Sequence, residues 1–206
     1  IQRLYLYSMS KTPHKSGYVS IVGNPNVGKS TLMNILGMID NPSGGKYHFL
    51  EHEVSNYSER QRSDLRKNNI GFIFQSFNLI DELTVFENVE LPLIYTKVGS
   101  AERKERVEEV LERMNMMHRR NHFPQQLAGG QQQRVFLARA LVQEADVYFM
   151  DEPFQGVDVT TEKAIVNILK ELKNTGKTVI VVHHDLQTVT DYFDWVTLLN
   201  VRRIAS

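Results

Sequence analysis

Hydrophobic residues are arranged along this chain in two alternating patterns. Short runs of β-branched and aromatic residues, bounded by Gly, Asp or Asn, are typical of strands covered on both faces of a sheet. The predicted strands are residues 18–23, 70–74, 146–150, 178–182 and 195–201. Between these runs, apolar residues recur three and four positions apart, which predicts amphipathic helices over residues 101–114 and 161–173. The alternation favours an α/β fold with a mostly parallel sheet.

Residues 76–145 carry helical patterns and no convincing strand. The simplest arrangement is a helical subdomain inserted between strands of one sheet, with a core formed by about residues 1–75 and 146–206. The whole chain of 206 residues is therefore predicted to be one domain.

Composition excludes several kinds of partner and site for such a domain. Lys plus Arg and Asp plus Glu are 24 each, so zero net charge gives no reason to expect nucleic acid as a partner. The absence of cysteine excludes a disulfide framework, a cysteine-ligated zinc site and a thiol nucleophile. With no run of about 18 apolar residues and a polar segment at residues 11–16, neither a membrane span nor a signal peptide is predicted. We therefore expect a cytoplasmic chain that is held at a membrane only through a partner.

The sharpest motif is the phosphate-binding pattern G-x4-G-K-[ST]. Its residues, with the threonine that follows, include Gly23, Asn24, Asn26, Val27, Gly28, Lys29, Ser30 and Thr31. The motif lies between a predicted strand and a helix, so backbone N–H groups and the helix N-terminus would face a phosphate. Lys29 can reach the β- and γ-phosphates of a nucleotide, and the Ser30 hydroxyl can bind Mg²⁺. A turn that binds nothing would not need the Lys-Ser pair, so nucleotide binding is predicted.

Asp151 and Glu152 follow a predicted strand, at the sheet edge where the phosphate loop is also expected. There Asp151 could hold Mg²⁺ through water, and Glu152 could act as a general base on the attacking water. Acidic residues often simply terminate strands, but downstream of a phosphate loop they indicate a catalytic pair.

His183 and His184 end the next predicted strand at the same edge, where a histidine could hydrogen-bond a γ-phosphate. A zinc site is the weaker interpretation, both here and for His118 with His122, because too few further ligands are in reach.

A second glycine pair precedes a predicted helix over residues 135–141. The segment Leu127-Ala128-Gly129-Gly130-Gln131 would present another phosphate-facing helix N-terminus. The chain then has one such loop too many for a single nucleotide, which favours a homodimer in which each loop completes the partner's site. Considered alone, a glycine pair before a helix is more often a plain turn.

Together these motifs resemble an ATP-binding cassette (ABC) ATPase, the motor subunit of ABC transporters. The order matches, from the phosphate loop through Gln75, the glycine loop at residues 127–131 and the acidic pair to His184. The resemblance implies a P-loop NTPase three-layer sandwich, ATP and Mg²⁺ as ligands, ATP hydrolysis and an ATP-dependent homodimer. It also implies a membrane transporter subunit as partner, docked through about residues 75–93.

Individual roles follow from the same resemblance. Ser30, Gln75 and Asp151 would serve Mg²⁺, and Asp158 would lie at the dimer contact. Catalysis would involve Glu152 as the base, together with Lys29 and the switch histidine His184. The glycine loop would bind the partner's nucleotide through Ala128, Gly129, Gly130 and Gln131.

The resemblance differs along the chain. Residues 46–126 look like the lipoprotein-release and macrolide-export branch, residues 144–205 like manganese or zinc importers, and residues 16–34 like Era-type GTPases. These likenesses predict a recombined or engineered chain, with simple divergence as the alternative. A GTPase-like switch is the minor functional alternative, because no guanine-reading Asn-Lys-x-Asp motif is present.

One departure from the family pattern bears on activity. Ala128 stands where the family has a serine whose hydroxyl reaches the partner's γ-phosphate. Its replacement predicts a weak dimer with feeble hydrolysis, and it keeps open the alternative of a P-loop scaffold that binds nucleotide with little turnover.

Overall fold

A five-stranded parallel sheet forms the centre of the molecule, with strand order β4-β5-β6-β1-β7. The computed structural model describes residues 18–23, 28–74, 79–154, 157, 159–183 and 195–199. The strands are β1 (Tyr18–Gly23), β4 (Ile70–Ile73), β5 (Val147–Asp151), β6 (Thr178–His183) and β7 (Trp195–Leu199). Each lies within a residue or two of a predicted strand, so the expectation of a parallel α/β sheet is confirmed.

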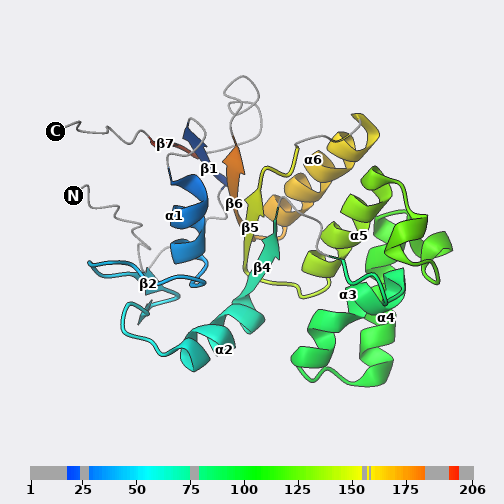
Figure 1. Ribbon diagram of the computed structural model, residues 1–206, viewed down its shortest axis with the longest axis horizontal. Coiled ribbons are helices and arrows are strands. Elements are labelled where there is room, and N and C mark those ends of the chain that lie inside the picture. The colour runs from blue at the N-terminus through cyan, green and yellow to red at the C-terminus, as the bar shows by residue number, and fades with distance from the viewer. Residues whose placement is uncertain are drawn as a thin grey trace.

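Helices cover both faces of this sheet. Helix α1 (Lys29–Leu36) lies on one face, and α5 (Gly129–Leu141) and α6 (Val159–Asn174) lie on the other (Figure 1). Alternate residues of β5 point to opposite faces: Phe149 packs in the cluster around α1, whereas Tyr148 and Met150 pack in the cluster around α5 and α6. Burial on both faces explains why the strand sequences are continuously apolar rather than alternating.

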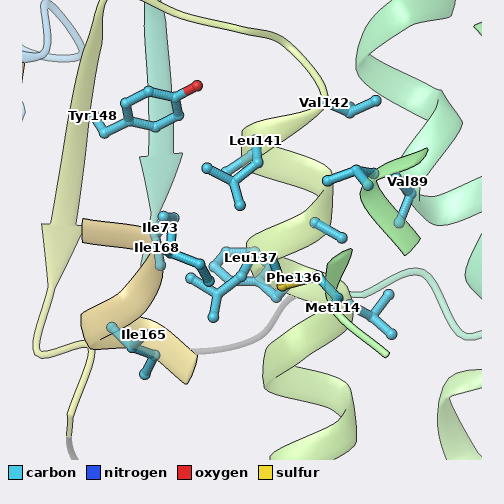
Figure 2. Close-up of a cluster of buried hydrophobic side chains, with 14 of the residues drawn as sticks. Ile73, Val89, Met114, Phe136, Leu137, Leu141, Val142, Tyr148, Ile165 and Ile168 are labelled. Carbon is cyan, nitrogen blue, oxygen red and sulfur yellow. The ribbon is translucent and has the colours of Figure 1, made fainter. Parts of the chain in front are cut away.

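The larger of the two clusters joins the sheet to α5 and α6. Ile165 and Ile168 of α6 lie beside Leu137 of α5, and Ile73 and Tyr148 complete the layer from the sheet side (Figure 2). The predicted apolar stripe of the helix over residues 161–173 is thus the buried face of α6.

Only helical elements lie between β4 and β5 in the part of the chain that the structure describes. They are α3 (Val85–Tyr95), α4 (Ser100–Arg113), the 3-10 turns Met117–Arg119 and Pro124–Gln126, and α5. Helices α3 and α4 both pack on α5, away from α1 (Figure 1). The structure confirms that residues 76–145, where they are described, contain helices and no strand, while their division from the core as a subdomain stays a prediction.

Helix α2 (Glu59–Asn69) and the two-stranded ribbon β2 (His48–Phe49) and β3 (His52–Glu53) are absent from the sequence-based assignment. The only buried residue of α2 is Arg62, so this helix has no apolar stripe for a periodicity analysis to detect. Its start was still visible as a capping box, in which the Ser58 hydroxyl accepts from the Gln61 N–H and Gln61 Oε1 accepts from the Ser58 N–H.

Candidate functional site

The turn between β1 and α1 begins at Gly23, the last residue of β1, and ends at Gly28, which precedes the first helical residue Lys29. Gly28 has φ +87°, in the left-handed region that glycine adopts without steric cost. The free N–H groups of a helix lie at its N-terminus, which for α1 is at Gly28 and Lys29, as a phosphate site requires. Asn24, Asn26 and Val27 lie outside the described residues.

Lys29 is the buried cation of this region. It is 9% exposed, and its ammonium nitrogen lies 3.4 Å from Oε1 of Glu152. Ser30 and Thr31, which follow it in the first turn of α1, are exposed. The geometry thus brings together the phosphate-loop lysine and one of the two predicted carboxylates, with two hydroxyl residues open to solvent beside them.

Asp151 and Glu152 stand at the carboxyl end of β5. Asp151 is the last residue of the strand and pairs with Val182 of β6, and Glu152 donates its backbone N–H to the Val182 carbonyl at 2.9 Å. Glu152 has φ +50°, a left-handed conformation that is uncommon for a residue with a side chain. This conformation turns the chain sharply at the end of β5, beside Lys29.

The electrostatics of the acidic pair favour a cation. Burial raises the pKa of the Asp151 carboxyl, the neighbouring Glu152 charge raises it further, and Lys29 only partly opposes both effects. Among the described residues, Lys29 is paired with Glu152, and its charge also lowers the pKa of Asp151. Ser30 and Asp151 offer hydroxyl and carboxylate oxygens, which are the ligand types that Mg²⁺ prefers, so the chemistry of the donor set fits this ion.

The glycine loop differs from its prediction in one respect. Gly129 and Gly130 are the first two residues of α5, whereas the helix was expected to begin at Val135. A first turn needs no intrahelical partners for its N–H groups, so glycine is tolerated there. Ala128 precedes the helix without a side-chain cap, and Gln131 Oε1 accepts the Ala128 N–H at 3.1 Å.

Some predicted residues cannot be placed. Gln75, Asp158 and His184 lie outside the described residues, although β6 ends at His183 between β5 and β1. His122 contacts the Arg119 guanidinium at 2.9 Å. In the described ranges no group of three or more His, Cys, Asp or Glu residues could hold a metal ion.

One contact of the site was missed by the sequence analysis. Gln133 of α5 is 5% exposed and donates from Nε2 to the carbonyl oxygen of Pro153 at 2.8 Å. Pro153 directly follows Glu152 in the chain. The available signal was a lone amide on the buried face of α5, whose other inward residues are apolar.

Comparison with known proteins identifies one family to which this chain is similar. The model of the ABC transporter family matches residues 6–155. An uncharacterized ABC transporter ATP-binding protein from Bacillus subtilis, YknY, is 41% identical over 180 residues, which is 87% of this chain and 78% of that protein. A similar uncharacterized protein from Thermotoga maritima is 45% identical over 174 residues, 84% of this chain and 74% of that protein.

The macrolide export ATP-binding/permease protein MacB of Bartonella henselae is 43% identical over 182 residues, 88% of this chain. This chain spans only 28% of that protein's length. Within the ranges that the structure describes, none of the helices combines the length and apolar character needed to cross a membrane.

Solved structures agree with the sequence relatives. A dimeric post-hydrolysis state of the ATP-binding cassette MJ0796 with bound ADP and Pi superimposes with a TM-score of 0.83 at 38% identity, over 90% of this chain and 82% of that one. The cbiO1 protein of Clostridium perfringens, part of an ABC transporter complex, gives a TM-score of 0.79 at 31% identity, over 89% of this chain and 73% of that one.

Proposed function

This chain belongs to the ABC transporter family, and from that premise we propose that it binds ATP at the β1–α1 turn and hydrolyses it beside Glu152. It is an ATP-binding, ATP-hydrolysing subunit of the family's motor type, an ATPase with the P-loop α/β fold. The GTPase-like switch and the non-hydrolysing scaffold are not favoured by any of these relatives.

The observation that carries the assignment of the site is the approach of Lys29 to Glu152. A phosphate-loop lysine and a candidate general base reach one point, 3.4 Å apart, from opposite parts of the chain. Phosphate groups bound by Lys29 would therefore lie close to the carboxylate that has to activate a water molecule.

The β1–α1 turn would hold the phosphates. Its residues are Gly23, Asn24, Asn26, Val27, Gly28, Lys29, Ser30 and Thr31. The left-handed Gly28 and the N-terminus of α1 support this role, because glycine adopts that conformation without steric cost and a helix N-terminus offers free N–H groups to an anion. Lys29 would supply the one close ammonium for the β- and γ-phosphates.

We infer Mg²⁺ as cofactor from the oxygen donors at the same place. Ser30, Gln75 and Asp151 would hold the ion, which when bound neutralises charge on the phosphates. The raised pKa of Asp151 supports the assignment, since a buried carboxylate beside Glu152 gains from a nearby cation.

Glu152 would then take the proton of the attacking water. Its position after β5 is held by the backbone bond to Val182, so the carboxylate is presented from a fixed turn rather than from a mobile loop. His184 would hydrogen-bond the γ-phosphate from the end of β6, which lies between β5 and β1.

A homodimer would complete the site, and the MJ0796 cassette, to which this chain is similar, is itself dimeric. The N-terminal turn of α5, with Ala128, Gly129, Gly130 and Gln131, would contact the partner's nucleotide. Ala128 offers a methyl group where a hydroxyl would donate, so we propose that this dimer is weak and depends on ATP.

A membrane transporter subunit is the second proposed partner, and it would keep this chain cytoplasmic and peripheral. The docking surface would follow residues 75–93 and the end of α3, where Ile94 is 46% and Tyr95 is 69% exposed. Large apolar side chains that stay exposed at two consecutive positions support a protein contact there.

A recombined or engineered origin remains a prediction of the local likenesses. It requires residues 16–34, 46–126 and 144–205, compared separately, to be most similar to three different branches. Equal similarity of all three segments to one branch would contradict it.

The binding site is tested by ATP-dependent thermal stabilisation. Bound ATP raises the melting temperature by mass action, and Lys29→Ala should abolish this shift because the triphosphate loses its close ammonium. Lys46→Ala, at an exposed lysine paired with Glu53, is the matched control and should keep the shift. An undiminished shift in Lys29→Ala would place the nucleotide elsewhere.

A further inference from the structure

Gln133 connects the helix that begins at the glycine loop with the turn that carries Glu152. It lies in α5, four residues after Gly129, and is 5% exposed. Its side-chain amide donates to the Pro153 carbonyl at 2.8 Å, and this hydrogen bond is buried. Burial of a side-chain amide costs free energy unless the amide is hydrogen-bonded, so the position of Gln133 in this apolar helix face depends on its bond to Pro153.

The hydrogen bond acts on a strained piece of backbone. Glu152 has φ +50°, and such conformations persist in residues with side chains only where the surroundings fix them. Two hydrogen bonds flank this residue: its N–H donates to Val182 at 2.9 Å, and the carbonyl of the next residue, Pro153, accepts from Gln133. The first bond comes from the sheet and the second from α5.

On the basis of the proposed function, we propose that Gln133 is the positioning residue of Glu152. Its amide fixes the turn that presents the carboxylate, so the orientation of Glu152 depends on the position of α5. Gln133 does not touch the reacting atoms and acts only through the backbone.

This arrangement also couples the position of the glycine loop to the position of the proposed base, Glu152. Gly129 and Gln133 belong to the same continuous helix, which spans Gly129–Leu141, and they are separated by about one turn. A shift at the N-terminus of α5, where the partner's nucleotide would bind, moves Gln133 as well. The Pro153 carbonyl then transmits that shift to Glu152.

The test compares Gln133→Met with Gln143→Met in the full chain. Methionine keeps the length and shape of glutamine but cannot donate. Gln143 is the matched control, because it lies just beyond the same helix and donates only within it, to Arg139 at 3.5 Å. The readouts are kcat, the Kd of ATP, and hydrogen exchange of the Glu152 amide measured without added ATP.

We expect Gln133→Met to lower kcat about tenfold while the Kd of ATP changes less than about twofold, because small misplacements of a catalytic group mainly affect the chemical step. The Glu152 amide should exchange faster, since its turn opens more readily. Gln143→Met should change neither kcat nor the exchange rate of the Glu152 amide.

A second variant, Gln133→Glu, adds a pH readout that a merely structural role would not produce. A protonated carboxyl can donate to the Pro153 carbonyl and a carboxylate cannot, so its kcat relative to the unmodified chain should rise as the pH is lowered. A flat ratio would contradict the proposal.

Two further results would overturn the positioning role. One is an unchanged kcat and unchanged Glu152 exchange in Gln133→Met. The other is a parallel loss of kcat, ATP affinity and melting temperature, which would mean that Gln133 only stabilises the fold. Failure of the proposed function itself would look different: the unmodified chain and Lys29→Ala would release phosphate equally, while the Glu152 exchange would still decide whether Gln133 holds the turn.

Discussion

The ammonium of Lys29 lies 3.4 Å from a carboxylate oxygen of Glu152, although the two residues are 123 positions apart in the chain. Their side chains are only 10% and 12% exposed, so solvent screens this ion pair weakly. Phosphates that bind Lys29 have to compete with Glu152 for it. On the proposed function, ATP binding would therefore loosen the pairing of Lys29 with the carboxylate that is proposed to take the proton.

Glu152→Gln separates binding from hydrolysis. The amide keeps the shape of the side chain but is uncharged, so it neither competes with phosphate for Lys29 nor repels phosphate. The Kd of ATP should therefore fall by about three- to tenfold. Phosphate release should fall about 10²-fold or more, since the general base is lost. Glu144→Gln, at an exposed carboxylate paired with Arg106, should leave both quantities unchanged. A Kd that does not change in Glu152→Gln would mean that Glu152 does not compete with the phosphates for Lys29.

The pKa of Asp151 is expected to lie above the ordinary aspartate value, because burial and then the charge of Glu152 both favour its protonated form. Glu152→Gln should lower this pKa, and Lys29→Met should raise it, since Lys29 opposes the shift. A titration of the carboxyl carbons followed by nuclear magnetic resonance measures both changes. Shifts of the opposite sign would contradict this account of the site's charge.

The same raised pKa has a consequence for stability. A carboxyl that binds its proton more tightly in the folded state stabilises the fold less as the pH rises through its folded pKa. Asp151→Asn should therefore raise the melting temperature at neutral pH, and the gain should shrink as the pH falls toward the ordinary value of about 3.9. Thermal melts over that pH range test this, and a constant gain would show that the carboxylate charge is not the cause.

Ala128→Ser has two expected effects that can be measured apart. Gln131 already accepts the Ala128 N–H, so a hydroxyl at this position completes a capping box by accepting from the Gln131 N–H. This should stabilise the chain by about 1 kcal/mol without added ATP. The second effect requires ATP: a hydroxyl that donates to the partner's γ-phosphate should shift the monomer–dimer balance toward the dimer.

Sedimentation with ATP, best performed in the Glu152→Gln background, measures the second effect. Ala128→Gly is the control, because glycine is also tolerated at a helix cap but brings no hydroxyl. If Ala128→Ser and Ala128→Gly dimerise equally, the backbone N–H groups are sufficient, and the weak-dimer proposal is wrong.

The side chain of Asn88 is expected to hold the segment before α3 in place through hydrogen bonds to its backbone. It is fully buried, its Nδ2 faces the carbonyls of Ile80, Leu83 and Thr84, and its Oδ1 accepts the Ile80 N–H at 2.8 Å. Asn88→Ala should destabilise the chain by about 2–3 kcal/mol, since it removes the hydrogen bonds of a fully buried amide and takes the Asn88 partner away from the Ile80 N–H and the Leu83 carbonyl. Asn68→Ala, which removes an exposed amide, should cost less than about 0.5 kcal/mol in chemical denaturation. Similar losses in both variants would contradict the role of Asn88.

The sheet and the apolar helices could be predicted because burial on fixed faces leaves a period in the sequence. Strand β5 and helix α6 are clear examples: Tyr148 and Met150 enter one core and Phe149 the other, and the apolar stripe of α6 enters the first. Helix α2 could not be found in this way, because it is stabilised by its capping box and by ion pairs of Glu59 with Arg62 and Arg66. Such a helix has no hydrophobic period.

The site was predictable only to the level of residue types at strand ends. Parallel strands bring their carboxyl ends to one edge, so the meeting of Lys29 and Glu152 followed from the fold class. The bond from Gln133 to Pro153 could not be foreseen, since it depends on how α5 lies against the turn after β5. That packing is set by apolar contacts whose detailed geometry a single sequence does not contain.

Phosphate release from Mg-ATP by the purified chain, measured at high protein concentration beside Lys29→Ala and Glu152→Gln, shows whether ATP is hydrolysed where Lys29 and Glu152 meet. We predict turnover by the unmodified chain, loss of ATP binding and turnover in Lys29→Ala, and loss of turnover with retained ATP binding in Glu152→Gln. Equal phosphate release by all three proteins would contradict this prediction, because the activity would then not depend on the site where Lys29 and Glu152 meet.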